Sequence, residues 1–114
     1  MTLRISVLLL ALAFTATASA STPVGSIAAG KNKAGVCGAC HGDGNKTLDA
    51  TYPKLAGQYP DYLSKALHEY KSGKRKNPIM GGQAANLSDQ DIADLTAYFG
   101  SLSGTVHDLS GHER

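Results

Sequence analysis

The sequence is poor in the residues that build large apolar cores. Its 114 residues include no tryptophan, two phenylalanines, two methionines and two cysteines. The formal net charge is only +2 at pH 7, and a balance so close to neutral argues against nucleic acid as a partner. No alternation of apolar and polar residues indicates a strand. These absences leave a small all-α chain that needs something besides its own side chains to hold it together.

One apolar run stands out, at the N-terminus. Arg4 is followed by apolar residues from Ile5 to Phe14 and by small residues ending in Ala18-Ser19-Ala20. This order is typical of a secretory signal peptide, here residues 1–20. The run of about ten residues is too short to span a bilayer comfortably, which disfavours the alternative of an uncleaved anchor. We therefore expect an exported protein that starts at Ser21 and resides in the periplasm.

The remaining chain predicts one domain, residues 21–103, with helices separated by long loops. A small-residue face favours a helix between Ser21 and Gly35. Pro60 suits the first turn of a helix that Gly73 ends, and Ser88 suits the N-cap of a helix that runs to about Ser103. Glycines and turn-forming residues predict loops over residues 42–57 and 74–82. The polar tail, residues 104–114, is expected to be flexible.

The two cysteines stand in the segment Cys37-Gly38-Ala39-Cys40-His41. A zinc site usually needs a second ligand pair, and His68, His107 and His112 do not provide one at that spacing. A thioredoxin-like dithiol would accompany a βαβ pattern, and a disulfide across two residues closes too small a loop to add much stability. Cys-x-x-Cys-His is instead the attachment signature of haem c, in which both thiols bond to the haem and the histidine reaches the iron.

A second iron ligand is expected from Met80, because Met1 leaves with the signal peptide. Met80 lies in Asn77-Pro78-Ile79-Met80-Gly81-Gly82, a predicted loop that lets the backbone approach a flat ligand. The alternative is a methionine that fills a gap in the core. His68 is expected at the surface, and the tail histidines in solvent. Ligation by His41 and Met80 would give low-spin iron with a raised reduction potential and no open site, which favours electron transfer over catalysis.

A basic run, Lys71, Lys74, Arg75 and Lys76, follows the middle predicted helix. Two interpretations of it stay open. One is a docking patch that steers an acidic redox partner, with Arg75 available to neutralise a haem propionate. The other is positive charge that stabilises the C-terminus of a helix.

Taken in order, the motifs resemble those of class I c-type cytochromes, and most closely the single-haem halves of the c4-type cytochromes and their short monohaem relatives. They are Cys37 to Gly42, Pro53 to Gln58, Tyr62-Leu63, Gly73 to Arg75, Met80, Leu87 to Asp89, and Ala97 to Phe99. The resemblance implies a small cytochrome c fold, with three to five helices and long loops wrapped around one covalently bound haem.

The resemblance also implies two contacts. Gly30 and Ala34 of the first helix would meet Tyr98 and Phe99 of the last. Pro53, which follows His41 by twelve residues, would offer its carbonyl to the imidazole of that histidine, although a simple turn proline is the alternative.

These observations predict a periplasmic monohaem cytochrome that is not an enzyme. It would carry single electrons between redox proteins such as a membrane cytochrome complex, a terminal oxidase or a periplasmic dehydrogenase. We expect a monomer or weak dimer, peripheral to the membrane at most. The alternatives are a small haem peroxidase, an electron-accepting subunit of a dehydrogenase, and a haem-free thiol–disulfide protein.

Overall fold

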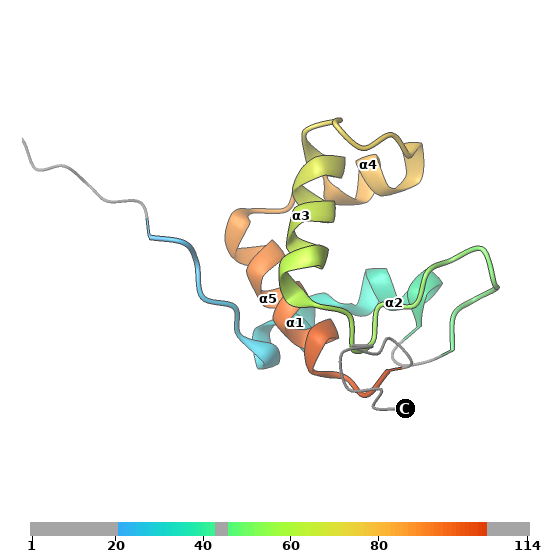
Figure 1. Ribbon diagram of the computed structural model, residues 1–114, viewed down its shortest axis with the longest axis horizontal. Coiled ribbons are helices and arrows are strands. Elements are labelled where there is room, and N and C mark those ends of the chain that lie inside the picture. The colour runs from blue at the N-terminus through green and yellow to red at the C-terminus, as the bar shows by residue number, and fades with distance from the viewer. Residues whose placement is uncertain (1–20, 43–45, 105–114) are drawn as a thin grey trace, which may run out of the picture.

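A computed structural model describes residues 21–42 and 46–104 of the chain. Over these residues it contains five helices: α1 (Ile27–Lys33), α2 (Gly35–His41), α3 (Pro60–Lys71), α4 (Pro78–Ala84) and α5 (Asp89–Ser101) (Figure 1). No strand occurs in this part of the chain, so the all-α prediction is confirmed. The predicted signal peptide, and the tail beyond Gly104, lie outside the described residues.

The two longest helices begin and end where the sequence predicts. Pro60 occupies the first turn of α3, and Gly73 follows its C-cap with a positive φ of 73°, a conformation that favours glycine. Ser88 caps α5 in a capping box, in which its hydroxyl accepts from the Asp91 N–H and the Asp91 carboxylate accepts from the Ser88 N–H. A proline at the first position therefore marks the start of α3, and a side-chain cap marks that of α5.

The N-terminal helix differs from its prediction, because the expected single segment is two short helices. Helix α1 begins only after Ser26, whose hydroxyl accepts from the Ala29 N–H at 3.3 Å. Ala34 separates α1 from α2. The second helix extends past the predicted end at Gly35 and includes both cysteines and His41.

The predicted loop over residues 74–82 is wrong from Pro78 onward, where α4 begins. The Asn77 side-chain oxygen accepts from the backbone N–H groups of Ile79 and Met80, both at 3.0 Å. This asparagine cap and the proline at the first helical position start the helix. Its two glycines lower the intrinsic helix propensity of the segment, which explains the wrong prediction. Met80 therefore lies in the first turn of a helix.

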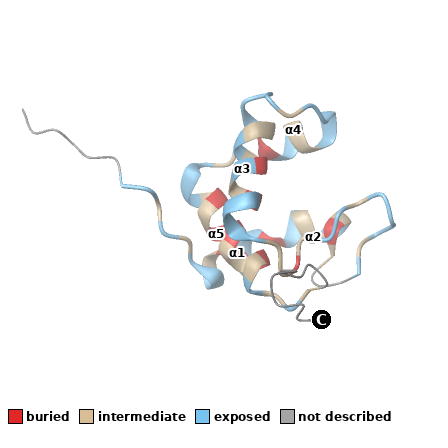
Figure 2. Ribbon diagram, in the orientation of Figure 1, coloured by how far each residue is buried: buried red, intermediate tan, exposed pale blue. Residues whose placement is uncertain are grey.

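The core forms where α1 and α3 pack against α5 (Figure 2). A Cβ atom on Gly30 would overlap the backbone carbonyl of Asp94 and lie 2.7 Å from the Cβ of Tyr98. Ala34 and Phe99 belong to one buried cluster. The expected contact of Gly30 and Ala34 with the last helix is thus present. Over the described residues, no helix has both the length and the apolar character needed to cross a bilayer.

Candidate functional site

Helix α2 presents both cysteines and His41 as neighbours. Cys37 is followed three residues later by Cys40 and four residues later by His41, so the three side chains lie on one helix face. Gly42 ends the helix with a φ of 71°, and a Cβ atom there would overlap the carbonyl of Lys46. The chain can turn directly behind His41 because this position is glycine. Burial raises the pKa of the Cys37 thiol.

His41 is buried, with 8% of its surface exposed, and one ring nitrogen is engaged. Its Nδ1 lies 2.7 Å from the carbonyl oxygen of Pro53. Because a carbonyl can only accept, Nδ1 carries the proton, and Nε2 of the neutral ring keeps its lone pair. Among the described residues, none hydrogen-bonds to Nε2. The geometry leaves this nitrogen available as a metal ligand.

Tyr52 adds a contact to this site that sequence reasoning missed. Its ring stands edge-on to the imidazole of His41, with centroids 6.2 Å apart and planes at 75°. In the chain without haem, the neighbouring Cys40 raises the pKa of the Tyr52 hydroxyl. Tyr52 directly precedes Pro53, but nothing in the sequence distinguishes it from the other four tyrosines.

A cavity of about 320 Å³ is lined by residues of both α2 and α4. Cys37 and Met80 line it from these two helices, which lie on the same side of α3 in Figure 1. Further apolar lining comes from Val36, Leu67, Leu87 and Leu95. Met80 and His41 are near each other. A thiol and a thioether on this largely apolar cavity, with the second thiol and the imidazole nitrogen on the next turn of α2, fit a covalently attached haem.

The basic run divides between residues held in the fold and residues free in solvent. The Arg75 guanidinium lies over the rings of Tyr62 and Tyr70, at 5.9 and 5.4 Å from their centroids, and pairs with Glu69 at 3.4 Å. Lys71 donates to the carbonyl of Leu87 at 2.6 Å. Lys74 and Lys76 are exposed.

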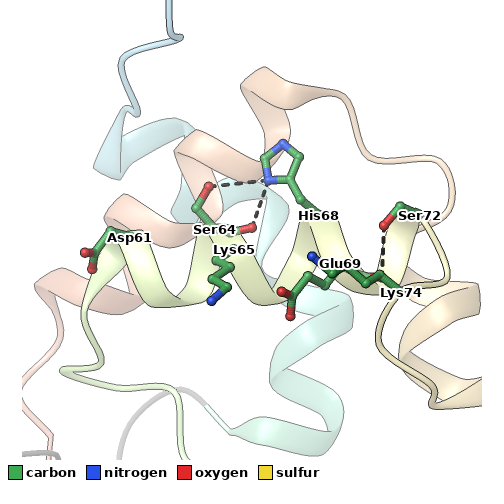
Figure 3. Close-up of a pocket in the computed structure, with 7 residues that line it drawn as sticks. All are labelled: Asp61, Ser64, Lys65, His68, Glu69, Ser72 and Lys74. Atoms are coloured by element: carbon green, nitrogen blue, oxygen red, sulfur yellow. Dashed lines mark hydrogen bonds between the residues drawn. The ribbon is translucent and has the colours of Figure 1, made fainter.

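A larger hollow of about 550 Å³ lies away from the cysteines, along the outer face of α3 (Figure 3). It is open to solvent and lined by charged side chains, including Asp61, Lys65, Glu69 and Lys74, so it does not suit an apolar cofactor. His68 is exposed, as predicted, and its ring contacts Ser64 and Asp89. Within residues 21–42 and 46–104, no group of three or more His, Cys, Asp or Glu side chains could hold a metal ion.

Comparison with known proteins identifies the family. The cytochrome c family model matches residues 27–103. Cytochrome c4 of Pseudomonas aeruginosa is 51% identical over 87% of this chain and 48% of its own length. Cytochrome c-554(548) of Halomonas halodenitrificans is 44% identical over 68% of this chain and 96% of its own length.

A solved structure shows the same fold. The crystal structure of reduced recombinant cytochrome c4 from Pseudomonas stutzeri superposes with a TM-score of 0.67 and 45% identity, over 73% of this chain and 48% of that one. The present chain thus spans about half the length of the cytochromes c4 that it matches. Together with the similarity to these cytochromes, the cysteine spacing in α2 implies covalently bound haem c with its iron. The chain belongs to the cytochrome c family and is a c-type cytochrome.

Proposed function

We propose that this cytochrome is an exported carrier of single electrons, with one haem whose iron is bound by His41 and Met80. The observation that carries the proposal is the arrangement of the side chains that would bind the haem and its iron. Cys37 and Met80 line one cavity from two helices, while His41 has its Nδ1 engaged and its Nε2 available.

Each residue would have a distinct role toward the cofactor. Cys37 and Cys40 would hold the haem through thioether bonds, and His41 would bind the iron through Nε2. The Pro53 carbonyl, 2.7 Å from Nδ1, would fix the orientation of the imidazole and make Nε2 a stronger ligand. The bound haem supplies the reversible uptake and release of one electron.

Filling both faces of the iron favours a carrier over an enzyme. With Met80 as second ligand, no position remains open for oxygen or peroxide, and the thioether raises the reduction potential. The backbone N–H of Met80 is held at 3.0 Å by the Asn77 side chain. This cap fixes the first turn of α4 and thereby limits the movement of the ligand when the iron changes oxidation state.

Docking would rely on the part of the basic run that the fold leaves free. Lys74 and Lys76 are exposed and can attract acidic surfaces of a membrane cytochrome complex, a terminal oxidase or a periplasmic dehydrogenase. Arg75 is held by Glu69 and two tyrosines, so its role would lie at the haem propionates or in the fold. Contacts between electron-transfer proteins are small and transient, which agrees with a monomer or weak dimer.

Absorption spectra of the exported protein test the iron ligands. Wild type should show sharp bands when reduced and, when oxidised, the weak far-red band that marks iron bonded to a methionine sulfur. Met80→Ala should lose that band and become high-spin. Ile79→Ala is the matched control, because Ile79 is the preceding residue of α4 and is 60% exposed. A wild-type spectrum that is already high-spin, or one unchanged in Met80→Ala, would refute the proposed ligation.

The intact mass of the purified protein tests export and attachment. A chain that starts at Ser21 and carries the mass of one haem is expected. Retention of residues 1–20 would contradict the predicted signal cleavage, and a mass without haem would contradict the role given to Cys37 and Cys40.

A further inference from the structure

A charged cluster joins α1 to α5 beside the candidate haem cavity. The Lys33 ammonium lies 2.7 Å from an Asp91 carboxylate oxygen and 2.6 Å from one of Asp94. Asp94 is only 3% exposed, and its carboxylate also accepts from the Ser26 N–H at 2.8 Å and the Gln90 side-chain amide at 2.9 Å. These contacts fix the three charged groups, Lys33, Asp91 and Asp94, as one unit, here called the Lys33 cluster.

The Lys33 cluster borders the candidate haem cavity. Lys33 and Asp91 line it together with Cys37 and Met80. Lys33 is the main cause that holds the pKa of Asp91 well below its usual range, and with hydrogen bonds from Ser26 and Gln90 it lowers the pKa of Asp94 to about 2. Both carboxylates are therefore ionised at neutral pH, and one positive and two negative charges give the cluster a net charge of −1.

This charge can act on a haem in the cavity. The side chains of Asp91 and Asp94 are 31% and 4% exposed, and charges partly removed from water are screened less than charges at the surface. A net negative charge stabilises the ferric state, which carries one more positive charge than the ferrous state. Lys33 neutralises one of the two carboxylates and so limits this effect.

We propose that the Lys33 cluster sets the reduction potential of the haem, with Lys33 raising it and Asp91 lowering it. The inference rests on the proposed function, because it needs the haem in the cavity that these residues line. Neither residue is a proposed ligand of the iron, and both would act through their charge.

Two substitutions of opposite charge separate this role from a structural one. Lys33→Gln should lower the potential, because two carboxylates then remain without a cation. Asp91→Asn should raise it, because one carboxylate and Lys33 then cancel. A cluster that only clamps α1 to α5 would reduce stability in both variants without shifting the potential in opposite directions. Lys33→Arg keeps the positive charge, so its reduction potential should stay close to that of wild type.

The experiment is a redox titration of the holoprotein at pH 8 and low ionic strength, followed by haem absorbance. Lys31→Gln and Asp89→Asn are matched controls, since each removes the same charge from the same helix end at an exposed position that does not line the cavity. Shifts of opposite sign that exceed those of the controls would support the proposal. Shifts of the same sign, or no larger than the controls, would overturn it.

If one variant fails to fold, the other still tests the sign of shift predicted for it against its own control. Wild type separates the two proposals. A wild-type protein without a low-spin spectrum would overturn the proposed function. A low-spin wild type whose variants show no opposed shifts would overturn only the role of the Lys33 cluster.

Discussion

Replacing Gly30 by alanine would place a methyl group in the contact between α1 and α5. The new Cβ would overlap the backbone carbonyl of Asp94 and lie 2.7 Å from the Cβ of Tyr98. A backbone carbonyl cannot rotate away as a flexible side chain can, so α1 would have to move off α5. Overpacking of this kind costs about 1–3 kcal/mol, and we expect the upper part of that range because the obstacle is rigid.

The helix propensity of alanine offsets part of this cost, by about 1 kcal/mol relative to glycine. The net loss in free energy of unfolding for Gly30→Ala is then about 2 kcal/mol, which lowers Tm by roughly 10 °C in a domain of this size. Thermal unfolding of the holoprotein, monitored by far-ultraviolet circular dichroism, measures this change in Tm.

Gly35→Ala is the matched control for this prediction. Nothing lies within 4 Å of a Cβ built at Gly35, so only the propensity gain should remain, and the variant should be as stable as wild type or slightly more so. Equal stability of Gly30→Ala and Gly35→Ala would refute the close approach of the two helices.

Three further predictions concern the N-cap of α5, the stability of the protein at low pH, and the charge of its surface. Ser88→Ala removes the N-cap and should lower the free energy of unfolding by about 1 kcal/mol in guanidinium titrations; no loss would mean that the cap is not formed in solution. Lys33 and hydrogen bonds lower the pKa of Asp94 to about 2, below an unfolded value of about 3.9. The stability that this shift provides is therefore present above about pH 4 and lost as the pH falls toward 2. Tm measured between pH 5 and pH 2 should fall less in Lys33→Gln than in wild type, and an equal fall in both would contradict the coupling. Lys74→Gln with Lys76→Gln should slow oxidation of the reduced protein by the ferricyanide anion and weaken its dependence on salt, as stopped-flow absorbance would show; unchanged rates would exclude these lysines from electrostatic steering.

The parts of the fold that could be predicted from sequence are those with local causes. Pro60 and Ser88 start their helices through contacts within one turn, and an apolar stripe continues each helix. Helix α4 also has local start signals in Asn77 and Pro78, but its two glycines lower its propensity and it forms against α3. The pairing of short elements depends on contacts distant in sequence, which periodicity does not report.

The same distinction between local and long-range causes applies to the candidate site. The residues proposed to attach the haem, Cys37 and Cys40, could be named from the sequence because that chemistry requires a fixed spacing. The expected contact of Pro53 with His41 came from the family resemblance, and the hydrogen bond is present at 2.7 Å. Tyr52 and the pairing of Lys33 with Asp91 became visible only in three dimensions, since nothing local distinguishes them from other tyrosines or surface charges.

The most direct test of the electron-carrier account is a redox titration of wild type followed by addition of carbon monoxide to the reduced protein. The account predicts a single reversible one-electron transition and a reduced spectrum that carbon monoxide does not change, because His41 and Met80 would both bind the iron and leave no position open. A spectrum that shifts at once on addition of carbon monoxide would reveal an open coordination position. That result would contradict the carrier account and favour a small haem enzyme.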